Sequence, residues 1–427
     1  MNYIHANQPG TKLAKALALS AIALACGSAL ATNGYFPHGY GIKAKGMGGA
    51  SVAMTDNAFA GANNPAVAAW AGNRAELGLD LFMPQRSMER VTTGQPTVSA
   101  TSDSTLFYVP EFGFNRTIND QMGWGVTVYG NGGMNTDYPI SQGACGPGTT
   151  NVLCGTTGRL GIDMMQLIVA PTFAYKFNPD HSVGVSPLLI QQTFKADGLD
   201  LFSTMGMSSA GGSLTNNGVD TSSGFGLRLG YLGKLSDSVN VGFSYSPRVS
   251  MSKFNKYAGL FAEAGGFDIP ENYALGFSAK LSPTTTVAAD YQRIRYSAVP
   301  SVGNPSNNPA LLGSANGPGF GWNDISVVKL GVQWAYSADL TLRAGINIGE
   351  NPVQSRDVTF NILAPGVVTS HVTVGGTYGL SKDSDLSFFY MYAPSNSVSG
   401  ANMLNPASTE TIKMNQQSIG IQFGWKF

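Results

Sequence analysis

From about residue 71 to the C-terminus, apolar side chains recur at every second position in segments of about ten residues. The last segment is the clearest: Ile419, Ile421, Phe423, Trp425 and Phe427 alternate with small or polar residues. A period of two places these five side chains on one face of a β-strand. Fourteen such segments can be counted, at residues 74–83, 104–117, 122–130, 163–177, 181–195, 222–234, 237–251, 271–282, 284–296, 323–337, 339–349, 368–382, 384–394 and 413–427. The sequence therefore predicts an all-β chain.

The connections between these segments alternate in length. Short turns such as Asn178-Pro179-Asp180 and Ser282-Pro283 follow the fourth, sixth, eighth, tenth and twelfth segments, whereas longer loops follow the odd-numbered segments from the third onward. Transmembrane barrels of bacteria have an even number of antiparallel strands, short periplasmic turns and long external loops. The pattern predicts a closed barrel with two unlike rims.

Alternation alone does not say which face of the wall is inside. A soluble barrel turns its apolar side chains inward, whereas a bilayer-spanning barrel turns them outward around a polar or small-residue lumen. An export signal, the chain length and a terminal Phe427 favour the membrane. So do aromatic residues near strand ends, where interfacial girdles lie: Trp124, Trp334, Tyr336, Tyr390, Tyr392 and Trp425.

We therefore expect a transmembrane antiparallel β-barrel over residues 71–427, in the outer membrane of a Gram-negative bacterium. Its surroundings would be outer-membrane lipid and lipopolysaccharide, and we expect a monomer.

The export signal lies in residues 1–31, which contain two lysines, an apolar run of about ten residues and Ala29-Leu30-Ala31 as a cleavage site. The apolar run is shorter than the roughly 20 residues of a spanning helix. A lipidated Cys26 is an alternative, but the residue three positions earlier is alanine, where lipoprotein signals usually have leucine. We predict a signal peptide and a mature chain that starts at Thr32.

Two cysteines remain after that cleavage. Cys145 and Cys154 lie nine positions apart in a segment rich in glycine, proline and threonine. In an exported protein this pattern predicts a disulfide that pins a loop. A metal site would need more ligands than two thiols, and no histidine, aspartate or glutamate lies between them.

Charge and motifs exclude several classes of function. Only 12% of the residues are charged, with 25 basic and 25 acidic side chains and no basic run, so nucleic acid is not an expected partner. His38, His181 and His371 lack the spacing of metal ligands. The chain has no G-x-S-x-G and no Walker loop. We expect no catalytic residues, no metal and no cofactor.

Residues 32–70 lack the strand pattern and are rich in glycine and alanine. A barrel of fourteen strands encloses more room than its own side chains fill, and glycine permits close backbone approach. We predict that this segment is a hatch that plugs the lumen, with Thr32, Tyr35, Phe36 and the tripeptide Asn64-Pro65-Ala66 among its residues. A periplasmic tail is the alternative.

The hatch sequence carries a family resemblance. Residues 41–53, Asp56-Asn57 and Asn64-Pro65-Ala66 resemble the N-terminal hatch of the FadL-type outer-membrane transporters for long-chain fatty acids and aromatic hydrocarbons. The resemblance implies passive uptake of hydrophobic small molecules. Such ligands enter a groove between outer loops, pass to a pocket held by the mature N-terminus, and leave sideways when the hatch moves. The family's wall gap lies at a kink in the third strand, here residues 122–130 with the following Asn131-Gly132-Gly133.

Two predicted loops carry apolar clusters that suit such a groove, because loops are normally polar. The cluster residues are Leu199, Leu201, Phe202, Met205 and Met207 in one loop, and Phe254, Tyr257, Leu260 and Phe261 in the other. Loop helices that pack on each other are the alternative. Arg228 and Arg343, on expected lumen faces, are candidates for meeting a substrate carboxylate, or else ordinary lumen polar residues.

Three other functions remain open at this stage. An adhesin or purely structural barrel would show no ligand-dependent behaviour. A hydrophilic porin would have a constriction of charged side chains and no hatch, which fits this weakly charged chain poorly. An outer-membrane lipase would need a serine and a histidine close together at the wall. We expect a channel and not an enzyme.

Overall fold

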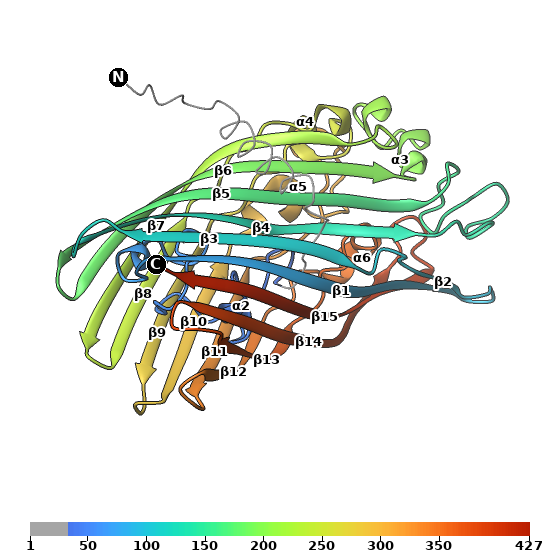
Figure 1. Ribbon diagram of the computed structural model, residues 1–427. Coiled ribbons are helices and arrows are strands. Elements are labelled where there is room, and N and C mark those ends of the chain that lie inside the picture. The colour runs from blue at the N-terminus through green and yellow to red at the C-terminus, as the bar shows by residue number, and fades with distance from the viewer. Residues whose placement is uncertain (1–32) are drawn as a thin grey trace, which may run out of the picture.

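The computed structural model describes residues 33–427, so the predicted signal peptide and Thr32 lie outside the described residues. Its strands form one antiparallel sheet in chain order (Figure 1). The strands are β1 (Arg74–Thr92), β2 (Val98–Thr101), β3 (Phe107–Thr117), β4 (Met122–Tyr138), β5 (Leu160–Asn178), β6 (His181–Asp197), β7 (Asp220–Ser236), β8 (Val239–Ser246), β9 (Asn272–Lys280), β10 (Thr285–Ile294), β11 (Ile325–Ala335), β12 (Leu340–Gly349), β13 (Ser370–Gly379), β14 (Ser384–Ala401) and β15 (Ser408–Lys426).

The sheet closes into a barrel because β15 pairs with β1 along their whole length, from Arg74 opposite Lys426 to Thr92 opposite Ser408. Of the fifteen strands, β2 pairs only with the end of β1, so fourteen strands form the closed wall. The predicted count and the predicted barrel are confirmed.

Several strands extend further than predicted at the rim with the long loops. The first predicted segment ended at residue 83, but β1 continues to Thr92, and the third ended at 130, but β4 continues to Tyr138. Conversely, β8 ends at Ser246 and not at 251. The extensions were missed because their outward side chains, such as Gln85 and Glu89, are polar, so the apolar alternation fades although the strand goes on.

The apolar face of the wall points outward. Phe225 is 67% exposed and Ile421 51%, whereas Glu76, Asp80 and Asn347 point inward and are buried. A surface covered by exposed leucine, valine and aromatic side chains suits lipid contact and not water. The question that periodicity left open is therefore resolved in favour of a bilayer-spanning barrel.

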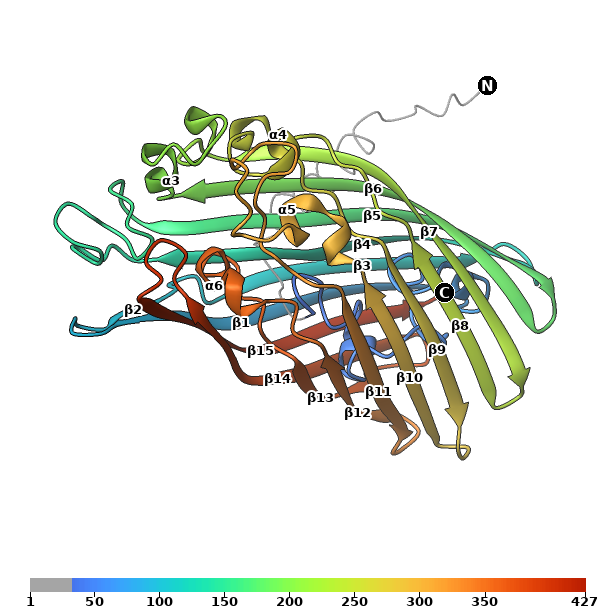
Figure 2. The same cartoon turned by 180° about the vertical axis from the view of Figure 1, so that it is seen from behind.

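The long loops carry short helical turns at one rim, where α3, α4 and α5 gather (Figure 2). These turns are α3 (Asp200–Thr204), η2 (Gly211–Ser213), η3 (Asn255–Tyr257), α4 (Ala262–Gly265), η4 (Tyr296–Ala298), α5 (Pro300–Gly303), η5 (Ser355–Asp357) and α6 (Val358–Asn361). In the loop from β4 to β5, Cys145 and Cys154 form the predicted disulfide. Between residues 33 and 427, no helix has the length and hydrophobicity to cross a bilayer.

Residues 33–72, here called the lumenal segment, lie inside the wall (blue in Figure 1). The segment contains α2 (Ile42–Lys45) and η1 (Pro65–Ala69). Helix α2 contacts the last strands, β13 to β15, whereas η1 contacts β3 to β7. The lumenal segment thus reaches both sides of the barrel.

Candidate functional site

Glycines in the wall make room for the lumenal segment. A Cβ atom at Gly184 or Gly230 would overlap Asn64 or Pro65, and one at Gly345 would overlap Met47. Glycine lets the two backbones come this close. Other inward glycines also face this segment: Gly113, Gly123, Gly242, Gly276, Gly331 and Gly375. These nine wall glycines therefore allow the lumenal segment to lie directly against the wall.

Buried ion pairs fix α2 to the wall. Lys45 Nζ lies 2.9 Å from Asp80 Oδ2 and 3.0 Å from Glu111 Oε2, and Lys43 Nζ lies 2.8 Å from Glu76 Oε1. The side chains of these five residues are at most 7% exposed. A buried charge left without its partner would be strongly unfavourable, so these pairs set the position of α2.

The tripeptide Asn64-Pro65-Ala66 anchors the other side. Asn64 Nδ2 donates to the carbonyls of Val52 and Tyr231, each at 2.8 Å. Its Oδ1 accepts from the amide of Ala66 at 3.1 Å, which caps η1, and Pro65 occupies the first helical position. The motif thus joins three parts of the chain through one amide side chain.

The beginning of the lumenal segment is held differently. The ring of Tyr35 lies 5.1 to 6.0 Å from four other rings, which belong to Phe36, Phe267, Tyr296 and Trp322. The hydroxyl of Tyr296 accepts from the amides of Tyr35 and Phe36 and donates to the carbonyl of Asn33. Apolar contacts dominate at this end, and no ion pair holds residues 33–40 among the described residues.

The wall is interrupted beside this aromatic cluster. Strand β3 pairs with β4 only between Phe112 opposite Val128 and Thr117 opposite Gly123, so residues 107–111 lack a partner on β4. On the other edge of β4, the pairing with β5 slips between Gly130 and Gly132. Gly132 has φ 141°, and the amide of Gly133 donates to the carbonyl of Tyr35 at 3.2 Å. The bulge lies in the third strand of the wall, where the resemblance implies a kink.

The two predicted loop clusters lie together at the long-loop rim. Leu199, Phe202, Leu260 and Phe261 line one apolar cavity of about 30 Å³, which Phe194 and Phe320 also border. Phe254 and Tyr257 are buried against the ring of Phe194. Met207 and Leu260 pack on the same core, Leu201 is half-buried, and Met205 is 55% exposed. Their role in binding stays a prediction.

Arg228 and Arg343 both contact the lumenal segment. Arg228 Nη1 donates to the carbonyls of Gly61 and Ala62 and to Tyr129 Oη. Arg343 donates to Gln333 at 2.9 Å and to Thr377 at 2.6 Å, and its Nη2 lies 3.5 Å from Asp56. The sequence did not predict these hydrogen-bond partners of Arg228 and Arg343, because most of them lie far away along the chain. A contact with a substrate carboxylate stays a prediction.

Sequence reasoning missed two groups of residues. Of the aromatic residues around Tyr35, it named Phe36 but not Phe267, Tyr296 or Trp322. The only sequence signal for them was the density of aromatic residues around Phe320 and Trp322. The lumenal carboxylates Glu76, Asp80 and Glu111 were detectable, because they alternate with apolar residues in predicted strands. Residues 33–427 contain no group of three or more histidine, cysteine, aspartate or glutamate side chains suited to a metal ion.

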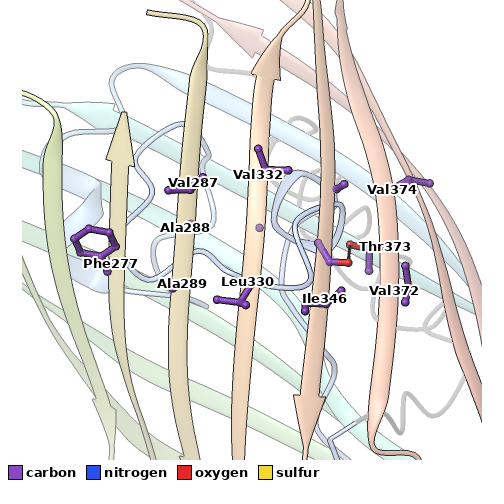
Figure 3. A pocket seen from close by; sticks show the side chains of 13 residues that line it. Phe277, Val287, Ala288, Ala289, Leu330, Val332, Ile346, Val372, Thr373 and Val374 are labelled. Carbon is purple, nitrogen blue, oxygen red and sulfur yellow. Dashed lines mark hydrogen bonds between the residues drawn. The ribbon is translucent and has the colours of Figure 1, made fainter. Parts of the chain in front are cut away.

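A shallow hollow of about 570 Å³ lies on the outer face of the wall, across β9 to β13 (Figure 3). Outward side chains such as Leu330, Val332 and Ile346 border it. Gly331 and Gly345 lie opposite each other at its floor, and Met47 of the lumenal segment lies directly behind them. The hollow faces lipid, so it is separate from the lumenal contacts described above.

Comparison with known proteins identifies the family. A family model described as outer membrane protein transport protein (OMPP1/FadL/TodX) matches residues 16–427. The long-chain fatty acid transport protein of Escherichia coli K12 is 22% identical, over 90% of this chain and 92% of the relative.

Solved structures share the fold. The toluene transporter TodX of Pseudomonas putida has a TM-score of 0.66 at 20% identity, covering 91% of this chain and 99% of that one. A FadL homologue of Pseudomonas aeruginosa has a TM-score of 0.69 at 13% identity, covering 92% and 100%. This chain belongs to the OMPP1/FadL/TodX family of transport proteins in the Gram-negative outer membrane.

Proposed function

We propose that the protein is a passive channel that takes up hydrophobic small molecules, either long-chain fatty acids or aromatic hydrocarbons. The observation that carries the proposal is the position of residues 33–36, between the apolar loop cavity and the unpaired stretch of β3. The named functions of the Escherichia coli and Pseudomonas putida relatives support the choice of substrates. In our proposal the protein acts as a monomer and has no enzymatic activity.

The proposed path has three steps. An apolar ligand first enters between the loops that carry Phe202 and Phe261, where it loses its contact with water. It then replaces the aromatic contacts of Tyr35 and Phe36. Finally it leaves sideways between β3 and β4 into the bilayer, because an apolar solute gains nothing from a watery exit.

The lumenal segment acts as a hatch in this proposal. Its first residues cover Gly132 and Gly133, and the hydrogen bond from the Gly133 amide to the Tyr35 carbonyl closes the unpaired stretch. A hydrophobic ligand competes for the same apolar contacts, so its arrival favours displacement of these residues. The ion pairs of α2 keep the rest of the segment in place.

The test is uptake of radiolabelled oleate and toluene into proteoliposomes. We compare the mature chain with a variant in which residues 33–38 are replaced by a glycine-serine stretch of equal length. We expect the replacement to change the uptake of both ligands strongly, because the contacts that couple ligand to hatch are gone. Unchanged uptake of both would refute the hatch mechanism. Equal permeation of a hydrophilic sugar through the unmodified protein would favour a porin.

The loop cavity is tested separately. Phe202→Asp and Phe261→Asp place a charge in an apolar site, and we expect a higher ligand concentration for half-maximal uptake. Val219→Asp, at a side chain that is 56% exposed, is the matched control. A result in which all three variants behave alike would count against binding between these loops.

A further inference from the structure

Within residues 33–427, Arg86 is a buried cation that forms no ion pair. It lies on β1 with its side chain inward and is only 3% exposed. One nitrogen, Nη1, donates to the carbonyl of Asn135 on β4, and the guanidinium carbon lies 5.4 Å from the ring centre of Phe107. Its Nε and Nη2 have no hydrogen-bond partner within the described part of the chain.

Arg90 lies four residues further along β1 on the same inward face, beyond Met88, and it has the ion-pair partner that Arg86 lacks. Its Nε and Nη2 donate to Glu410 Oε1 at 2.9 and 2.6 Å, and Nη2 also donates to the carbonyl of Val152 at 2.6 Å. The Nε and Nη2 groups form the edge with which an arginine holds a carboxylate bidentately. Arg90 uses this edge for Glu410, whereas the same edge of Arg86 is empty.

The surroundings of Arg86 are mainly apolar, apart from Asn135, whose Oδ1 also has no hydrogen-bond partner among the described residues. Arg86 borders a small cavity with Phe82, Met134, Trp322, Pro365 and Met414, and no acidic side chain lines that cavity. Asp163 on β5 acts on Arg86 electrostatically but forms no ion pair with it within the range 33–427. An unpaired charge in such a place is costly, so the free Nε and Nη2 of Arg86 point to a ligand that completes the site.

The position of the cavity links it to the proposed path. Trp322 lies 6.0 Å from the Tyr35 ring, measured between ring centres, and Asn135 belongs to the part of β4 that has no partner on β3. An apolar chain that replaces Tyr35 at the unpaired stretch would therefore have its end close to the guanidinium.

We propose that Arg86 binds the carboxylate of an amphiphilic substrate, with Nε and Nη2 as the donors, while the apolar tail lies against Trp322 and the Tyr35 cluster. The proposal rests on the proposed function and deepens it: the site favours an anionic fatty acid over a neutral hydrocarbon of equal size. The cavity has a volume of about 10 Å³, room for about one water molecule. Binding of a carboxylate therefore requires the cavity to widen.

The experiment compares oleate with oleyl alcohol, which has the same chain and no charge. Binding to the purified mature protein in a nonionic detergent is measured at pH 8 for the unmodified protein, Arg86→Gln and Arg86→Lys. Arg116→Gln, at an exposed position near the other end of the wall, is the control. We expect Arg86→Gln to weaken oleate about tenfold or more and to leave oleyl alcohol unchanged. Arg86→Lys keeps the positive charge but not the paired donors of the guanidinium, so it should weaken oleate binding less than Arg86→Gln does.

Equal loss for both ligands, or no loss for either, would overturn the role of Arg86. Heat-modifiable gel mobility reports whether each variant has folded, and if Arg86→Gln does not fold, Arg86→Lys must still weaken oleate more than the alcohol. Failure of the proposed function looks different: the unmodified protein would then transport neither ligand into proteoliposomes. If the unmodified protein transports both ligands but the substitutions leave the ratio of oleate affinity to oleyl alcohol affinity unchanged, only the proposed role of Arg86 is rejected.

Discussion

The two ends of the lumenal segment are attached to the barrel by different forces. Residues 41–72 are held by buried ion pairs and by polar side chains such as Asn64 and Asn115, whose Nδ2 donates to the carbonyls of Ala68 and Gly72. Residues 33–40 are held mainly by aromatic contacts with the loops. An apolar ligand can replace an aromatic contact but not a buried charge pair. The comparison therefore indicates which end can yield to a ligand.

The largest effect is expected for Lys45→Met. The substitution leaves Asp80 and Glu111 buried without their cation, which costs about 3–5 kcal/mol when a buried pair is broken. We expect α2 to leave its place, so that the amides of residues 41–48 exchange hydrogen quickly and the barrel conducts ions in planar bilayers. A variant that stays closed and protected would show that the ion pairs do not hold this end.

The next effect is expected for Gly184→Ala. The added methyl group would overlap the backbone at Pro65 and Ala66, and overpacking of this kind costs about 1–3 kcal/mol. We expect faster proteolysis near η1 and a lower Tm. Gly212→Ala is the matched control, because a Cβ there meets nothing within 4 Å. Equal Tm values for the two variants would contradict close packing at this point.

A smaller effect is expected for Tyr296→Phe, at the end held by aromatic contacts. The ring stays, but the hydroxyl that bonds Asn33, Tyr35 and Phe36 is lost, and a lost hydrogen bond of this kind costs about 0.5–1.5 kcal/mol net. We expect faster exchange at residues 33–36 with no change at 41–48, measured by mass spectrometry. Tyr336→Phe, at an exposed ring, should change neither region. Loosening of both regions together would show that the two ends move as one body.

The smallest effect is expected for Asp56→Asn. Asp56 is 36% exposed and lies 3.5 Å from Arg343, which keeps its bonds to Gln333 and Thr377. Partly exposed pairs contribute about 0–1 kcal/mol, so exchange in residues 41–72 should stay close to that of the unmodified protein. If Asp56→Asn increased hydrogen exchange as much as Lys45→Met, the solvent exposure of an ion pair would not predict how strongly it holds the lumenal segment.

The wall was predictable, but the side-chain contacts inside it were not. The apolar alternation predicted the fourteen strands because every second side chain of a strand faces lipid and is apolar, as at Ile419, Ile421 and Phe423. Near the long-loop rim the outward side chains need not be apolar, so the alternation fades there, and β1 and β4 were predicted too short. The disulfide followed from spacing in one loop. The partners of Arg228 and the empty edge of Arg86 depend on contacts between distant segments, which no local pattern encodes.

Helix α2 crosses the line where the first and last strands meet. Lys43 reaches Glu76 on β1 and Asp385 on β14, and the amide of Ile42 donates to Gln422 on β15. The lumenal segment, which precedes the wall in the sequence, therefore binds the strands that are synthesised last. These contacts of α2 can therefore form only after β14 and β15 have taken their places in the wall.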